Sequence, residues 1–305
     1  MVEVLCVKNV FLILFLPVVE LTVVPVQRLV ERINLPFQTV TKESIANLQL
    51  KADLLITCSF GLMIPAKLIE NASYTVNVHP SLLPQYRGPA PIYHSILNGD
   101  RHTGVSLQTL HPKKFDEGII FDQSYPVPIE ENETFLSLWD RLALKGAEML
   151  LNCVQNRTYQ HPTPIQTFTE PSYASMVTKQ IDWYKITAVE ASRLARCVDP
   201  ITGVITLDEG KRSFVHLRGV KVREKGSAEQ PGHYFLPKHA ESRKNKLCVV
   251  CKDRTTVWVD EVKVSGKDWI DGVEFFSSAP DRFWGQRFTP WRKEFEDHDP
   301  SEFEF

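Results

Sequence analysis

The stretch from Asn77 to Ile92 has the sequence N-V-H-P-S-L-L-P-Q-Y-R-G-P-A-P-I, and His111 to Gly118 follows with H-P-K-K-F-D-E-G. Asn77 and His79 are two residues apart, so on an extended strand both side chains lie on the same face. Pro80 has no N–H group and keeps His79 extended, which predicts that the strand ends here. Two polar side chains at the end of a strand, followed by a turn rich in Pro and Gly, indicate a site rather than core.

Asn77, His79 and Asp116 have side chains suited to one kind of chemistry. An amide donates a hydrogen bond to an oxygen that gains negative charge, and an imidazole takes or holds a proton near neutral pH. A carboxylate orients that imidazole, favours its charged form or relays a proton. Because no obvious Ser or Cys nucleophile accompanies them, we expect direct acyl transfer from an activated donor to an amine. Spacing alone leaves open whether the three residues converge.

These motifs carry a resemblance to a known family. Asn77-x-His79, the Ser81–Pro84 turn with Arg87-Gly88, and Asp116-x-Gly118 resemble the signature of the 10-formyltetrahydrofolate-dependent formyltransferases. The resemblance implies a Rossmann-like α/β domain with a mostly parallel sheet, followed by a small OB-like β-barrel domain. It also implies 10-formyltetrahydrofolate as formyl donor and no metal.

The resemblance assigns roles to individual residues. It implies that Asn77, His79 and Asp116 are catalytic. It implies folate contacts from two segments of the chain: Phe60, Gly61, Leu62 and Met63 after a buried strand, and Ser81, Leu82, Leu83 and Pro84 in the turn. Without the resemblance, the segment from Phe60 to Met63 is a simple strand-to-helix turn.

The chain is most similar to the family members that act on tRNA, and the H-P-K-K-F-D-E-G wording resembles their mitochondrial eukaryotic form. This implies formyl transfer to the α-amino group of initiator methionyl-tRNA, in a monomer of the mitochondrial matrix without a membrane partner. Arg87, Gly88 and Lys113 are then expected to contact substrate. For Lys113 and its neighbour Lys114, which lie beside the site and could meet a phosphate or carboxylate, a solvent-facing position is the favoured alternative. The alternatives are a sugar-nucleotide amine formyltransferase and a catalytically impaired, truncated form that only binds RNA.

Composition indicates two domains, because 305 residues with 43% hydrophobic content can bury two cores. We place the catalytic domain at 1–169, a linker at 170–186, the barrel at 187–293 and a tail at 294–305. Charge is uneven: 13 basic minus 16 acidic residues give −3 over 1–172, 22 minus 15 give +7 over 173–293, and 0 minus 6 give −6 over the rest. The basic second half indicates a polyanionic partner, with contacts expected from Lys211, Arg212, Arg243 and Lys244. A solvated charged surface is the alternative.

The start of the chain departs from the family. Its members open with a strand, a Gly-containing turn and a helix, whereas here the resemblance begins near Val24. We therefore expect a truncated or replaced first unit, and with it the loss of a central strand. The apolar run of residues 10–19 is shorter than the ~20 residues of a membrane span and is expected to be a buried strand.

The six cysteines are scattered along the chain. Only Cys248 and Cys251 have the spacing of a metal or redox pair, and no second pair completes a zinc site. We therefore expect buried cysteines of a reducing compartment.

Hydrophobic periodicity predicts the remaining elements. Strands are expected over 53–59, 75–79, 104–110 and 119–127, and helices over 90–98, 135–156 and 188–197. The longest helix is expected to bury Leu138, Leu142, Ala143, Met149, Leu150 and Val154. Short strands are then expected over 203–207, 214–223, 232–235, 246–251 and 255–264.

Overall fold

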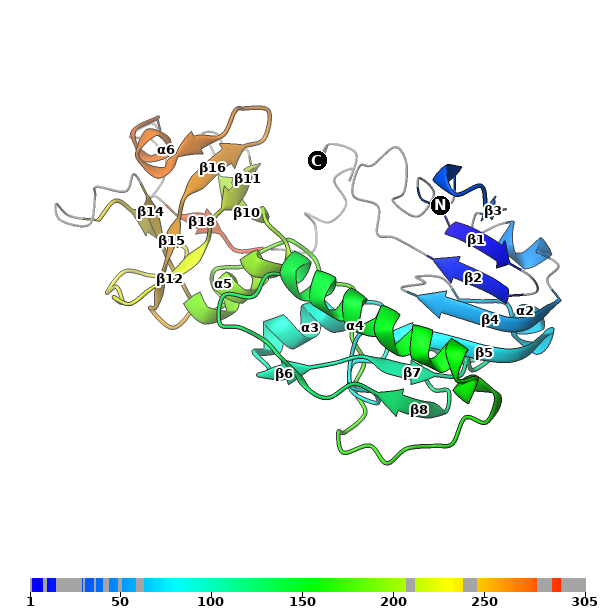
Figure 1. Ribbon diagram of the computed structural model, residues 1–305. Coiled ribbons are helices and arrows are strands. Elements are labelled where there is room, and N and C mark those ends of the chain that lie inside the picture. Colours follow the sequence, from blue (N-terminus) through cyan, green and yellow to red (C-terminus); the bar gives the residue numbers. More distant parts are fainter. Residues whose placement is uncertain are drawn as a thin grey trace. The chain divides into compact units, whose positions relative to one another are not determined.

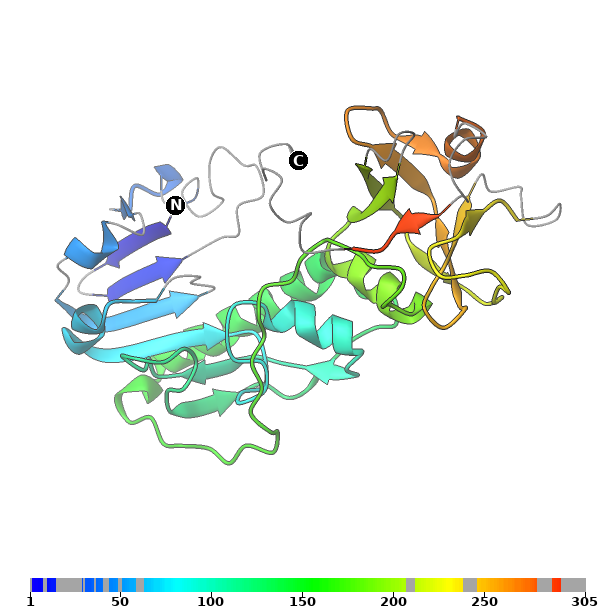
Figure 2. The ribbon, with the colours of Figure 1, turned by 180° about the vertical axis from the view of Figure 1, so that it is seen from behind.

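The structure is a computed structural model, and it describes residues 2–7, 10–14, 29, 31–35, 37–40, 44–48, 51–58, 63–206, 212–237, 246–278 and 287–291. The chain forms two compact units (Figures 1 and 2). The first contains the chain up to Met176 except residues 132–135, and the second contains residues 132–135 and the chain from Val177 onward. Each unit is described by itself.

The first unit is built on a seven-stranded sheet with the order β3–β1–β2–β4–β5–β7–β8. Its strands are β1 (Val2–Val7), β2 (Val10–Leu14), β3 (Phe37–Val40), β4 (Ala52–Cys58), β5 (Ala72–His79), β7 (Ser106–Gln108) and β8 (Ile120–Gln123). β2, β3, β4, β5 and β8 run in one direction, and β1 and β7 run in the other. The expected mostly parallel sheet is confirmed.

A hairpin forms the start of this sheet. β1 and β2 pair antiparallel through Val7 and Val10, because only residues 8 and 9 join them and a parallel pair needs a much longer crossover. β2 then pairs in parallel with β4, so the position beside β4 is filled by a strand. A strand within residues 10–19 is therefore confirmed over Val10–Leu14, whereas β1 was not predicted.

β4 and β5 form the centre of the unit. The side chains of Leu54, Leu55, Ile56 and Val76 are at most 5% exposed, which explains why these strands are apolar runs rather than alternating ones. Helix α4 (Phe135–Gln155) packs against β5 on the side of the sheet that faces the reader in Figure 1. A Cβ atom on Gly146 would lie 2.9 Å from Val78 Cγ1, so the absence of a side chain lets the helix approach β5 closely.

The buried face of α4 differs from the predicted one. Leu138, Leu142 and Met149 are buried as expected, but Gly146 and Cys153 complete the face, and Ala143 is exposed. Glycine contributes nothing to a hydrophobic pattern, so the predicted buried face left out Gly146 and included Ala143.

Shorter elements complete the first unit. They are η1 (Ile45–Asn47), α2 (Ala66–Glu70), α3 (Pro91–Asn98), β6 (His102–Thr103), β9 (Val127–Pro128) and η2 (Thr158–Gln160). Pro91 stands in the first turn of α3, and Gly99 ends the helix with a φ of +70°. The predicted strands over 104–110 and 119–127 are too long. β7 and β8 are shorter, and Val127 belongs to β9, which pairs with β6.

The second unit begins with α5 (Ala188–Cys197), whose bounds agree with the predicted helix because Thr187 and Glu190 form a capping box. Nine short strands and α6 (Gly272–Ser278) follow among the described residues. The strands are β10 (Ile201–Thr206), β11 (Arg212–Arg218), β12 (Lys221–Arg223), β13 (Tyr234–Phe235), β14 (Leu247–Val250), β15 (Thr256–Val259), β16 (Glu261–Val264), β17 (Ile270–Asp271) and β18 (Phe288–Thr289).

These strands form two antiparallel sheets, β17–β16–β11–β10–β18 and β12–β15–β14–β13. The chain crosses from one sheet to the other at Gly219, whose φ is +63°, and again at Asp260. A bridge between His233 and Arg287 links the β13 edge of one sheet to the β18 edge of the other. The pairings therefore close a ring of short strands, which confirms the small barrel.

Large side chains fill the barrel. Trp183, Tyr234 and Phe288 are each at most 1% exposed, and Trp183 and Tyr234 each have their ring centroid 5.6 Å from that of Phe288. Cys248 and Cys251 are fully buried beside this core and are not disulfide-bonded, as expected. Burial raises the pKa of Cys251 to about 12. No helix in the described part of the chain is long and apolar enough to cross a membrane.

Candidate active site

A row of three polar side chains crosses the carboxyl-terminal end of the sheet. Thr57 on β4 is paired in register with Asn77 on β5, and Asn77 is paired with Gln108 on β7. Paired residues place their side chains on the same face, so the three lie side by side. Thr57 and Gln108 are each 1% exposed and Asn77 is 9% exposed. Buried polar groups of this kind require hydrogen-bond partners.

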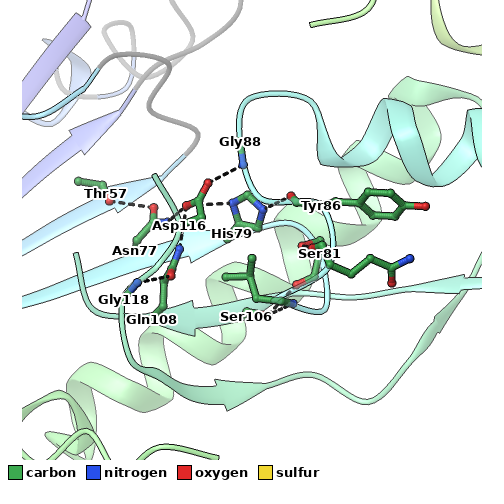
Figure 3. A network of polar contacts seen from close by, with 12 residues as sticks. Thr57, Asn77, His79, Ser81, Tyr86, Gly88, Ser106, Gln108, Asp116 and Gly118 are labelled. Atoms are coloured by element: carbon green, nitrogen blue, oxygen red, sulfur yellow. Dashed lines mark hydrogen bonds and ion pairs between the residues drawn. The ribbon is translucent and has the colours of Figure 1, made fainter. Parts of the chain in front are cut away.

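The amide of Asn77 has one defined orientation. Thr57 Oγ1 donates to Asn77 Oδ1 over 2.9 Å, and Asn77 Nδ2 donates to Asp116 Oδ1 over 3.1 Å (Figure 3). The opposite orientation would place the amide oxygen against a carboxylate oxygen, where neither atom can donate. One hydrogen of Nδ2 remains without a partner among the described residues, and it is available to a ligand.

Asp116 joins the ends of several segments. Its Oδ1 accepts hydrogen bonds from Asn77 and from Gln108 Nε2 over 2.8 Å, and its Oδ2 accepts one from the backbone N–H of Gly88 over 2.8 Å (Figure 3). The residue has a φ of +51°, in the left-handed region that Asp tolerates better than most residues. Three donors hold the carboxylate in this conformation.

His79 lies behind Asp116 and is 5% exposed. Its Nε2 is 2.8 Å from the carbonyl oxygen of Tyr86, which can only accept, so Nε2 carries a hydrogen. Its Nδ1 is 3.5 Å from Asp116 Oδ1. A proton taken up by His79 would therefore enter at Nδ1, facing a carboxylate.

The two motif glycines are explained by close contacts. A Cβ atom on Gly118 would overlap the carbonyl of Thr109, and the N–H of Gly118 donates to Gln108 Oε1 over 3.3 Å. Gly88 has a φ of +100°, and a Cβ atom there would lie 2.6 Å from the ring of Tyr173. The D-x-G spacing thus ties the Asp116 loop to β7.

Side chains on β7 and β8 hold the Ser81–Pro84 turn by hydrogen bonds to its backbone. Ser106 Oγ donates to the carbonyl of Ser81 and accepts from the N–H of Leu83, and Gln123 Nε2 donates to the carbonyl of Leu83. Ser81, Leu83 and Pro84 are buried and Leu82 is half-buried. The turn therefore supports the adjoining segment, and the predicted folate contact of these four residues stays a prediction.

Asp116 also lines a cavity. The polar residues of its lining include Thr57, Asn77, Gln108 and Asp116, and the apolar ones include Met63, Ile64, Ile69, Leu110 and Phe115. Met63, predicted to contact folate, thus lies beside the catalytic candidates. Lys114 also lines the cavity, and its Nζ donates to Glu117 over 2.9 Å, which lowers the pKa of that carboxyl.

Other predicted substrate residues lie at varied positions. Arg87 Nη1 is 3.5 Å from Glu117 Oε1, at the edge of the site, and Lys113 is exposed. Arg212 is exposed on β11 of the second unit. Phe60, Gly61, Leu62, Lys211, Arg243, Lys244 and the tail 294–305 lie outside the described residues.

Sequence reasoning missed Thr57 and Gln108. Thr57 is a single polar residue in the otherwise apolar run L-L-I-T-C, and Gln108 follows Val105-Ser-Leu in a similar run. A polar side chain in a buried strand is a signal for a site, because its burial requires a partner. The partners came from segments 20 and 8 residues away and could not be read from spacing.

Comparison with known proteins supports the resemblance to the formyltransferases. Residues 24–154 match the family model described as "Formyl transferase", and residues 176–280 match "Formyl transferase, C-terminal domain". "Methionyl-tRNA formyltransferase" of Lactobacillus gasseri is 33% identical over 256 residues, which covers 81% of this chain and 75% of that protein. The chain belongs to the formyltransferase family.

Two further comparisons bear on this formyltransferase. "Methionyl-tRNA formyltransferase, mitochondrial" of Saccharomyces cerevisiae is 36% identical over 171 residues, covering 48% of this chain and 43% of the yeast protein. HypX from Aquifex aeolicus, solved in complex with tetrahydrofolic acid, has a TM-score of 0.53 at 18% identity over 80% of this chain and 43% of HypX. The latter likeness concerns the fold alone.

The formyl donor of the family is 10-formyltetrahydrofolate. The lining of the cavity suits a ligand with both apolar surface and polar edges, because it combines apolar side chains with amide and carboxylate groups. Among the residues that the structure describes, no group of three or more His, Cys, Asp or Glu side chains could hold a metal ion.

Proposed function

We propose that this formyltransferase transfers the formyl group of 10-formyltetrahydrofolate to the α-amino group of initiator methionyl-tRNA. The observation that carries the proposal is that Asn77 and Asp116 line one cavity, with Nδ1 of His79 lying 3.5 Å from Oδ1 of Asp116. Relatives named for methionyl-tRNA support the acceptor, because their similarity extends over both units of the chain.

The chemistry follows from the donors and acceptors of the site. The free amine attacks the formyl carbon, a C–N bond forms, and the formyl oxygen gains negative charge. The second N–H of Asn77 Nδ2, which has no partner among the described residues, donates a hydrogen bond to that oxygen. The C–N bond to the folate nitrogen then breaks, the oxygen returns to a carbonyl, and the folate nitrogen takes up the proton that the attacking amine has lost, so that it leaves as a neutral amine.

The amine must lose a proton during this transfer. In the proposal, Asp116 and His79 receive it: the proton passes to the carboxylate or to Nδ1 of His79, 3.5 Å away. The hydrogen bond from Nε2 to the Tyr86 carbonyl keeps Nδ1 facing Asp116 throughout. The resulting imidazolium lies against a carboxylate, which stabilises its charge.

The barrel supplies the expected tRNA contacts in this proposal. Lys221 and Lys225 are exposed, and the guanidinium of Arg223 lies 5.3 Å from the ring centre of Trp258 and 5.8 Å from that of Phe235. Lysines contact phosphates, and aromatic rings with arginine can stack on unpaired bases. Such binding weakens as salt increases.

We also propose a mitochondrial location, supported by the yeast relative and by the H-P-K-K-F-D-E-G segment.

The test is transfer of labelled formyl from 10-formyltetrahydrofolate to aminoacylated tRNA, with initiator and elongator methionyl-tRNA compared. Preferential labelling of the initiator is expected. Labelling of a nucleotide-linked amino sugar instead would identify a different acceptor, and binding of tRNA without transfer would show an RNA-binding protein that is not active.

A further inference from the structure

Thr57 and Gln108 are buried polar residues, and each forms a hydrogen bond with one of the catalytic candidates. Thr57 and Gln108 stand in register on either side of Asn77, and each is 1% exposed. We propose that Thr57 and Gln108 are positioning residues, which act through Asn77 and Asp116 to fix the donor and the carboxylate of the site. The inference rests on the roles proposed above for those two residues.

Thr57 acts on the amide. Asn77 Oδ1 can only accept a hydrogen bond, so the Thr57 hydroxyl is the donor over their 2.9 Å contact. This contact occupies the oxygen end of the amide and directs the Nδ2 end toward Asp116 and the cavity. Asp116 alone would hold the amide from one end only. With Thr57 in place, the amide plane is fixed from both ends and the free N–H has a defined direction.

Gln108 acts on the carboxylate. Its Nε2 donates to Asp116 Oδ1 over 2.8 Å, and its Oε1 accepts from the N–H of Gly118 over 3.3 Å. Both ends of this amide are therefore bound to the Asp116 loop, while its backbone belongs to β7 (Figure 3). Oδ1 is also the atom that faces Asn77 Nδ2 and His79 Nδ1. Gln108 thus holds the one oxygen at which the two other groups meet.

The arrangement predicts a kinetic effect rather than a binding effect. The amide and the carboxylate act on charges that develop during transfer, so a misplaced group lowers kcat more than it raises KM. A typical hydrogen bond corresponds to a factor of about three to tenfold. We expect Thr57→Val, which removes the donor but keeps the volume, to lower kcat about tenfold and to change either KM by less than about twofold.

The experiment compares wild type, Thr57→Val, Thr57→Ser, Asn77→Ala and the double variant Thr57→Val with Asn77→Ala. Thr57→Ser keeps the donor and should restore most of kcat. Because Thr57 acts through Asn77, the double variant should be no slower than Asn77→Ala alone. Thr103→Val is the matched control, since Thr103 is a buried threonine on β6, and it should behave as wild type.

Gln108→Met tests the role of Gln108 in the same way, because methionine has a similar volume to glutamine but no hydrogen-bond donor. Equal kcat in wild type and folded Thr57→Val, or a double variant about tenfold slower than Asn77→Ala, would overturn the proposal.

A ¹H–¹⁵N spectrum of asparagine-labelled protein tests the positioning without any acceptor. The Asn77 side-chain pair should be sharp and slowly exchanging in wild type and Thr57→Ser, and broadened in Thr57→Val. If wild type does not formylate methionyl-tRNA, the proposed function fails, and an unchanged Asn77 signal in Thr57→Val would separately refute the positioning.

Discussion

Replacing Asp116 by asparagine tests the polar centre at its most connected point. The carboxylate offers two oxygens to three donors, the side chains of Asn77 and Gln108 and the N–H of Gly88. An amide of the same size offers one oxygen and an NH2 group. Whichever way it turns, its NH2 group faces at least one of these donors, and that donor loses its partner.

The size of the effect follows from this count. An unsatisfied buried donor costs about 1–3 kcal/mol. For a unit of this size, each kcal/mol lowers Tm by roughly 2–4 °C, so the variant should melt roughly 2–12 °C below wild type. Turnover should fall by ~10²–10⁴, because His79 loses its charged partner and the amine loses a proton acceptor.

The assay is thermal melting of the purified protein together with formyl transfer under saturating donor and tRNA. Asp122→Asn is the matched control, since Asp122 is an exposed carboxylate on β8, and it should change neither quantity beyond about twofold in rate or 1–2 °C in Tm. An Asp116→Asn protein with the Tm and kcat of wild type would refute the account of the site.

Three further predictions concern other features. Gly118→Ala should destabilise the protein by about 1–3 kcal/mol and lower activity, because the new methyl group overlaps the Thr109 carbonyl, and urea denaturation measures this. Burial and the hydrogen bond to Asp100 raise the pKa of Tyr86 to about 12, above the ~10 of an unfolded chain. This tyrosine's contribution is therefore complete below pH ~10 and is lost as pH rises through about 12, so Tyr86→Phe should cost about 1 kcal/mol at pH 8 and progressively less above pH 10 in denaturant titrations. Burial also raises the pKa of Cys251 to about 12, so native protein should leave this thiol unmodified at pH 8 while urea-unfolded protein is alkylated, as peptide mass mapping would show, and rapid native labelling would contradict the buried position.

Elements with local signals were predictable from the sequence. Helix α5 has the predicted bounds because a capping box fixes its start, and the strand ending at His79 was marked by Pro80. The same local logic placed Asn77 and His79 on one face. The chemistry of its carboxylate suggested Asp116 as a partner, but its convergence with His79 and Asn77, which come 37 and 39 positions earlier in the chain, was expected only from the resemblance.

What escaped prediction depends on contacts between distant segments. Thr57 and Gln108 acquire their meaning from strand register, which is set by tertiary packing. β1 was not predicted although V-E-V-L-C-V is polar only at Glu3, and its pairing with β2 and β3 makes it a strand. The buried face of α4 depends on Gly146, whose contribution is a close approach rather than hydrophobicity.

The most direct test of the central claim is a single-turnover measurement of formyl transfer to initiator methionyl-tRNA by wild type and by Asn77→Ala, with circular dichroism confirming that both are folded. Loss of the donor to the developing oxyanion predicts a rate lower by ~10²–10³ in Asn77→Ala, with donor and tRNA binding retained. A folded Asn77→Ala protein that transfers formyl within threefold of the wild-type rate would contradict the account.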